Sequence, residues 1–252
     1  MVDEPAIDQV PEAEQNPVVA FPLTRMIYCV GVAFILNEIL AFGSWLLLQK
    51  ELHPPFGLSR FDFWLLCVDL SFLLSVLAAS MLYDPKFAWC IWRTPSSEGA
   101  RGFKSIVTGL VGGIAALALA SPVFWFVPPL IPRAESFRSY SIETLIARAF
   151  SPLCVLELIF FVIALALGSE VLFRGIVLRT LEGCASRWAA IFGSTLLFAA
   201  IYPVLDIPTA IILGIASAML YQRTRNLLAP STANAIFITG GAAIRLYHAM
   251  MR

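Results

Sequence analysis

Charged residues are scarce in this chain. Asp, Glu, Lys and Arg make up 13% of its 252 residues, and 59% of the residues are hydrophobic. A soluble domain typically has about 25% charged residues. The 17 basic and 17 acidic residues balance, so the basic stripe that a nucleic-acid partner requires is not indicated. The composition therefore excludes an ordinary soluble domain and predicts a polytopic membrane protein with no nucleic-acid partner.

Histidine and paired cysteine are also scarce. The only two histidines are His53 and His248, and the five cysteines occur singly, without a CxxC pair. This pattern does not favour a zinc-thiolate site or a disulfide framework. The HExxH motif of helical zinc sites is missing as well. We therefore expect no cofactor and no metal.

The first residues lack the features of a cleavable signal peptide. Such a peptide opens with a basic region and continues into an apolar run. Residues 1–20 instead hold five acidic residues and no Lys or Arg. We expect residues 1–21 to be an acidic disordered tail, and residues 22–252 to form a single transmembrane helical domain.

Long apolar runs fill most of the remaining chain. A membrane-spanning helix needs about 20 mostly apolar residues, and seven segments are candidates. They are 26–48, 62–83, 104–127, a segment from Pro152 into the stretch 168–183, 188–205, 207–222 and 227–250. They predict an all-α, polytopic transmembrane helical bundle of about seven spans. Small-residue pairs, Gly109 with Gly113 and Gly214 with Ala218, predict close helix packing within the chain. The basic residues of loop 84–104 favour a cytoplasmic N-terminus.

A few ionisable residues interrupt these apolar runs. They are Glu38, Asp69, Glu157, Glu170 and Arg174. Ionisable residues within spans are expected to face the bundle interior and to mark functional sites. Glu170 and Arg174 are four residues apart, so they share one helix face. Two interpretations remain open for this pair: an ion pair that pins the helix to its neighbours, or an acid retained in a catalytic pocket.

Three segments carry polar residues in a recognisable order. They are GSEVLFRGIVLRTLE (168–182), RWAAIFGSTLLFAAIYP (187–203) and GIASAMLYQRTRNLLAPSTANAIF (214–237). Together they resemble the motifs of the CPBP intramembrane proteases, which include CAAX prenyl endopeptidases and bacterial immunity proteins. The resemblance implies a CPBP/CAAX-protease-like fold with its core at about 150–240. It also implies an integral protein of the bacterial cytoplasmic (inner) membrane.

The chain departs from the family pattern at key polar positions. The first motif of the family has two adjacent glutamates, and Ser169 replaces the first of them. The second motif has a histidine four residues after a phenylalanine; here Phe198 is followed by Tyr202. Asn234 stands where the third region has a histidine, and Ile238 where it has an asparagine.

These departures bear on the chemistry that the resemblance implies. The proposed hydrolysis in the family needs a water activated by a glutamate, with histidines that orient it or hold a metal. A serine is not a carboxylate base, and a phenol or an amide does not replace a neutral imidazole. Only Glu170 and Arg174 retain the family's residue types.

We therefore predict a degenerate member of the family that acts by binding. It would be a subunit, adaptor or stabiliser of a membrane protein complex, with a membrane protein as partner, or a pocket that holds a lipid, prenyl chain or peptide. Two alternatives remain. One is an active CAAX-type endopeptidase that uses Glu170 as its base. The other is a proton-coupled transporter that uses Glu38, Asp69 and Glu157.

Overall fold

The computed structural model describes residues 23–49, 60–84, 99–130, 152–202 and 206–250. Within these ranges the chain is helical apart from short connections, which confirms the predicted all-α class. The helices are α1 Leu23–Gln49, α2 Arg60–Tyr83, α4 Gly99–Leu130, α6 Pro152–Glu170, η2 Val171–Leu178, α7 Arg179–Cys184, α8 Arg187–Ala200, α9 Ile207–Thr224 and α10 Leu228–Met250.

The seven predicted helical segments are all present. The fourth runs from Pro152 into the stretch 168–183, as predicted: α6 continues directly into η2 and then α7, and the continuous helical segment ends at Cys184. The helix α4 begins at Gly99, inside the stretch 84–104 that was predicted to be a loop. The predicted acidic tail 1–21 lies outside the described residues.

Three helices are long and apolar enough to cross a membrane, judged by length and composition over the described residues. They are Leu23–Leu46, Leu66–Tyr83 and Gly102–Phe124. The helix α8, by contrast, has 14 residues. At about 1.5 Å per residue it is roughly 21 Å long, shorter than a hydrocarbon core of about 30 Å. The chain is thus an integral membrane protein. Its helices, however, differ more in length than the seven predicted spans do.

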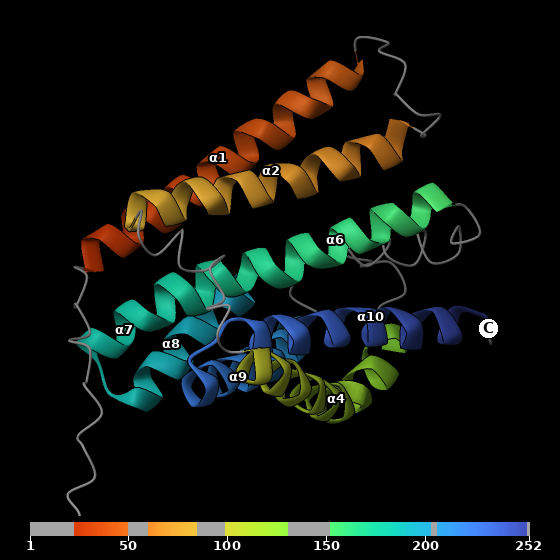
Figure 1. Cartoon of the computed structure of the whole chain (residues 1–252). Coiled ribbons are helices and arrows are strands. Elements are labelled where there is room, and N and C mark those ends of the chain that lie inside the picture. The colour runs from red at the N-terminus through yellow and green to blue at the C-terminus, as the bar shows by residue number, and fades with distance from the viewer. Residues whose placement is uncertain (1–22, 50–59, 85–98, 131–151, 203–205, 251–252) are drawn as a thin grey trace, which may run out of the picture.

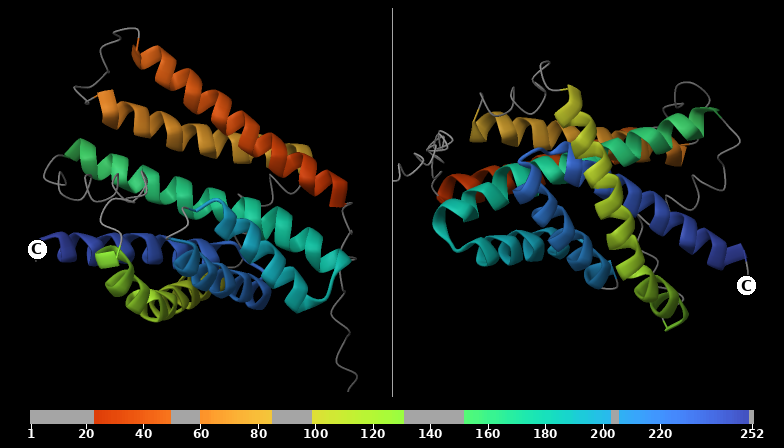
Figure 2. Two further views of the ribbon diagram at one scale, coloured as in Figure 1. Left: turned by 180° about the vertical axis from the view of Figure 1, so that it is seen from behind. Right: turned by 60° about the horizontal axis from the view of Figure 1, so that its bottom comes forward.

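The helices form two groups around α6 (Figures 1 and 2). The pair α1 and α2 lies side by side at one edge, and α4, α8, α9 and α10 lie on the other side of α6. Small residues bring neighbouring helices close together. A Cβ atom added to Gly113 of α4 would lie 2.8 Å from the backbone of Ala233 in α10. One added to Gly214 of α9 would lie 2.7 Å from Thr195 in α8. The predicted packing of these small-residue pairs within the chain is therefore confirmed.

The π-helix η2 lies at the centre of the fold. All eight of its residues are buried, and Phe173 packs edge-on against Phe198 of α8, with ring centroids 5.4 Å apart. Polar contacts fix the following turn. The Tyr83 hydroxyl of α2 lies 2.8 Å from the Thr180 hydroxyl, and Glu182 pairs with Arg225 at 2.6 Å. The segment from α6 to α7 is therefore held by α2, α8 and α9.

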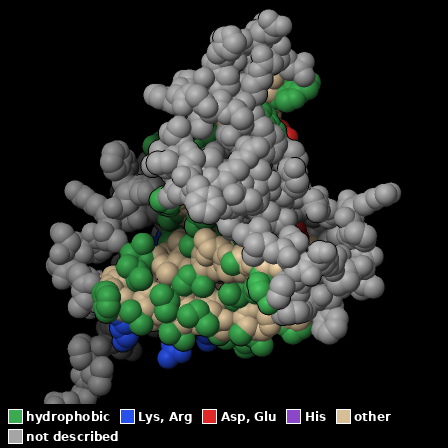
Figure 3. Space-filling view, turned by 90° about the vertical axis from the view of Figure 1, so that its right-hand side faces the viewer, with side chains coloured by type: hydrophobic (Ala, Val, Ile, Leu, Met, Phe, Trp, Pro, Cys, Tyr) green, Lys and Arg blue, Asp and Glu red, His purple; other side chains and the backbone are tan. Residues whose placement is uncertain are grey.

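Large hydrophobic side chains are exposed at the surface of the bundle. On the side shown in Figure 3, the described surface is mostly hydrophobic, with a few Lys and Arg side chains at its lower border. On α4 the exposed residues include Leu119, at 70% exposure, and Val111, at 61%. Such a surface is suited to lipid rather than water, because the apolar side chains are not packed against the described helices.

Candidate functional site

The candidate site is built around an unusual stretch of backbone. Glu170 is the last residue of α6, and the next eight residues form the π-helix η2, which contains Arg174. A π-helix is bonded from residue i to i+5, is rare, and often occurs at functional sites. The spacing of apolar residues gave no sign of it, so the sequence predicted an ordinary α-helix here.

Glu170 and Arg174 form an ion pair inside the protein. The distance from Arg174 Nε to Glu170 Oε2 is 3.1 Å, and both side chains are 0% exposed. The geometry therefore agrees with the first of the two interpretations, in which the pair neutralises itself. Burying two charges is favourable only when both are well paired and hydrogen-bonded. The contacts that surround this pair thus decide what it can do.

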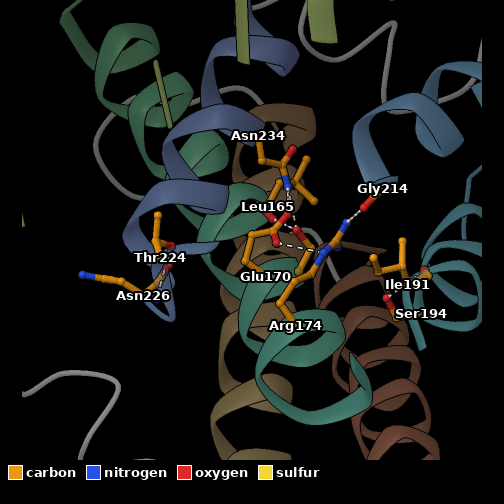
Figure 4. A network of polar contacts seen from close by, with 10 residues as sticks. Leu165, Glu170, Arg174, Ile191, Ser194, Gly214, Thr224, Asn226 and Asn234 are labelled. Atoms are coloured by element: carbon orange, nitrogen blue, oxygen red, sulfur yellow. Dashed lines mark hydrogen bonds and ion pairs between the residues drawn. The ribbon is translucent and has the colours of Figure 1, made fainter. Parts of the chain in front are cut away.

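Two of the replaced family positions, Ser169 and Asn234, are hydrogen-bonded to each other. The Asn234 side-chain amide of α10 donates to Ser169 Oγ at 2.9 Å and to Glu170 Oε1 at 3.1 Å. The Ser169 hydroxyl in turn donates to the backbone carbonyl of Leu165. Figure 4 shows the amide of Asn234 directed at the carboxylate of Glu170. The structure therefore brings Ser169, Glu170 and Asn234 together across α6 and α10.

Arg174 also connects this cluster to α8 and α9. Its Nη2 donates to the backbone carbonyl of Gly214 at 3.0 Å. Its Cζ lies 4.5 Å from the centre of the Phe198 ring, which is within the range of a cation–π contact. Sequence reasoning missed the Gly214 carbonyl, although the small-residue pair at Gly214 marked a close approach. The guanidinium therefore connects η2 to two other helices.

The last predicted site residue, Tyr202, lies at the border of the cluster. It is half-buried, and its ring packs on Phe198 with centroids 5.0 Å apart. The Tyr202 ring therefore contacts the same Phe198 ring that Arg174 contacts. Tyr202 belongs to the site through this ring contact.

Several buried polar atoms around the pair have no hydrogen-bond partner among the described residues. Besides the two ion-paired atoms, they include Arg174 Nη1, Thr195 Oγ1 and Asn234 Oδ1. Thr195 lies against Gly214. Buried polar groups in proteins are usually paired with protein or water. The cluster therefore keeps both donors and acceptors that its own side chains do not use.

The residues at the site do not fit a metal centre. A zinc site takes three or four N, S or O ligands, and no group of three His, Cys, Asp or Glu side chains comes together within the described residues. The only carboxylate of the cluster, Glu170, is already paired with Arg174. Both His53 and the side chain of His248 lie outside the described residues.

The other ionisable candidates differ in their surroundings. Asp69 is buried in α2. Glu38, which was expected to face the interior, is exposed on α1. That expectation was wrong, because α1 packs mainly on α2 and leaves much of its surface open. The side chain of Glu157 is not among those described.

Comparison with known proteins places these residues in one matched segment. Residues 151–238 match the family model described as Type II CAAX prenyl endopeptidase Rce1-like. No curated protein and no solved structure matches the chain. The matched segment contains every residue of the cluster, from Ser169 to Asn234. The resemblance seen in the sequence is thus confirmed over residues 151–238, the segment that is similar to the Rce1-like CAAX prenyl endopeptidases.

Proposed function

We propose that this chain is a catalytically degenerate member of its family that acts by binding, as a subunit, adaptor or stabiliser of a membrane protein complex. One observation carries the proposal. The Asn234 amide, at the position of a family histidine, is hydrogen-bonded to Ser169 and Glu170. The side chains that stand where the family's proposed mechanism needs a base and an imidazole are thus hydrogen-bonded to each other.

The bonding of Glu170 argues against a role as general base. Such a base must accept a proton from water and must be placed to do so. Here Oε1 accepts from Asn234, Oε2 faces Arg174, and the side chain is 0% exposed. Asn234 has no titratable group with which to pass a proton on. Water would first have to reach a carboxylate that is fully buried.

The same contacts suit a role in holding helices. Through Glu170 and Arg174 the cluster connects η2 to α9 and α10, and Phe198 adds α8. Interhelical hydrogen bonds in membranes average about 0.6 kcal/mol each, so they fix helix orientation more than they add stability. A fixed arrangement of helices is what a binding subunit offers its partner.

The second candidate is an active endopeptidase with Glu170 as base. It is favoured by the match to a model of CAAX prenyl endopeptidases. The unpartnered Arg174 Nη1 and Asn234 Oδ1 would then contact a polar group of the substrate. The transporter alternative receives no support from the exposed position of Glu38.

Two experiments on the full chain separate these candidates. Gentle purification from the native membrane, followed by identification of stoichiometric companions, tests the binding function. Incubation of the reconstituted protein with a prenylated CAAX peptide, beside its Glu170→Gln variant, tests hydrolysis. The proposal predicts a stoichiometric membrane protein and no cleavage that depends on Glu170. A lone protein that cuts the peptide, and stops cutting it in the variant, would overturn the proposal.

A further inference from the structure

The helix α1 is the most peripheral of the three candidate spans. It lies at one edge of the molecule beside α2 (Figures 1 and 2). Only 17% of the residues in its span Leu23–Leu46 are buried, against 44% in the α2 span. The side of α1 that faces away from α2 is therefore not covered by any described helix.

Four residues at successive turns form a stripe along this open side. They are Gly31, Ile35, Glu38 and Phe42, and we call them the α1 stripe. At about 100° per residue, they all fall within roughly 60° of one another around the helix. Ile35 is 64% exposed and Phe42 60% exposed, and Glu38 is exposed as well. The stripe is thus an apolar surface with one carboxylate and one glycine in it.

Glu38 does not suit contact with lipid. The midpoint of the span Leu23–Leu46 lies between residues 34 and 35, so Glu38 is about 5 Å along the axis from it. This depth is well inside the hydrocarbon core, where carboxylates are costly and normally face a partner. The exposed side of α4 offers a comparison, because residues 105–124 contain no ionisable side chain. A lipid-facing helix of this chain therefore carries no charge at mid-span, and α1 does.

Gly31 gives an independent indication that another helix approaches here. A Cβ atom on Gly31 would meet nothing within 4 Å, so the glycine serves no packing contact with the described residues. Gly113 of α4 shows the opposite case, since α10 occupies the space beside it. Small residues on the surface of a transmembrane helix allow a second helix to pack closely. Gly31 leaves room for such a helix two turns from Glu38.

We propose that the α1 stripe docks a transmembrane helix of a partner protein, and that this helix carries a Lys or Arg at mid-membrane to pair with Glu38. The inference rests on the proposed binding function and names the surface that would perform it. A second copy of the chain fits less well. Two parallel α1 helices would place Glu38 against Glu38. The three candidate spans offer it no basic partner at mid-membrane either, because their basic residues, Arg25 and Lys104, lie near the span ends.

The test uses a defined probe and the full chain in phosphatidylcholine vesicles. The probe is a synthetic leucine–alanine transmembrane helix with one central lysine, and its control has leucine at that position. A photo-crosslinking residue placed at Ile35 reports contact, and one placed at Val111 of α4 reports background. We expect the lysine probe to crosslink at Ile35 about fivefold or more above the leucine probe, as an interhelical polar contact would allow. Crosslinking at Val111 should not distinguish the two probes.

Matched variants locate the contact. Glu38→Gln should remove most of the preference for lysine, and Gly31→Phe should reduce crosslinking of the lysine probe to the level of the leucine probe. Gly43→Phe is the control, because a Cβ there also meets nothing within 4 Å but lies about 120° around the helix from Gly31. Its crosslinking should remain that of the wild type.

Three results would overturn the docking surface: equal crosslinking of both probes, equal effects of the two glycine variants, or efficient crosslinking of a second copy through Ile35. These failures differ from failure of the proposed function. Cleavage of a prenylated peptide that requires Glu170 contradicts the binding function whatever the stripe contacts. Equal crosslinking of the two probes by the wild type, without any such cleavage, removes the docking surface alone.

Discussion

Replacing Arg174 by methionine removes the charge at the centre of the buried cluster and keeps an unbranched, flexible side chain. The variant loses the 3.1 Å contact with Glu170, the 3.0 Å hydrogen bond to Gly214 and the contact with the Phe198 ring. Glu170 is then left in the interior with neutral donors alone, among them the Asn234 amide. Removing one partner of a buried ion pair typically costs about 3–5 kcal/mol, and we expect a loss of this size.

The double variant Glu170→Gln with Arg174→Met tests the cause of that loss. It leaves no buried charge, and the glutamine oxygen can still accept from Asn234. Replacing a whole buried pair by neutral residues is often close to neutral in stability. We therefore expect the free energy of unfolding of the double variant to lie within about 1–2 kcal/mol of the wild-type value. The effects of the two single changes would then be strongly non-additive.

Reversible unfolding by sodium dodecyl sulfate in mixed micelles, followed by tryptophan fluorescence, gives these free energies. Arg225→Met is the control, because Arg225 pairs with Glu182 at 2.6 Å but is 62% exposed. An exposed pair typically contributes no more than about 1 kcal/mol. The reasoning is refuted if Arg174→Met costs no more than Arg225→Met, or if the double variant is as unstable as the sum of its single changes.

Three further predictions use the same unfolding measurement. Gly113→Leu should lower the free energy of unfolding by about 1–3 kcal/mol, because the new side chain would meet the α10 backbone. Gly43→Leu has open space and should change it very little. Equal losses in the two variants would contradict this packing. Tyr83→Phe removes the hydrogen bond to Thr180 and should cost about 0.5–1.5 kcal/mol; no loss would show that this bond is not formed. Asn234→Leu removes two hydrogen bonds and should cost about 1–2 kcal/mol; an unchanged stability would exclude it from the network.

The sequence predicted the helices well, because a membrane restricts the chain to long apolar segments. It also placed Glu170 and Arg174 on one helix face, since residues four apart lie on the same side, and the structure pairs them. The family motifs singled out both Ser169 and Asn234, and the structure brings them into contact although they are 65 positions apart. These predictions succeeded where spacing along the chain or a family pattern determines the neighbour.

Other features had no such signal. The π-helix at 171–178 has no distinct apolar period in a segment that is apolar on all sides. The acceptor of Arg174 is the backbone carbonyl of Gly214, and every residue carries a carbonyl. The exposure of Glu38 depends on which side of α1 packs on α2, and hydropathy does not report that. Helix orientation within the bundle is therefore what the sequence left open.

The central claim is that this chain binds and does not cut, and cleavage tests it most directly. The wild type and Glu170→Gln are reconstituted in the same lipid and incubated with a prenylated CAAX peptide, and the released tripeptide is quantified. The account predicts no release above the protein-free vesicles in either sample. Release by the wild type that disappears in Glu170→Gln would contradict it.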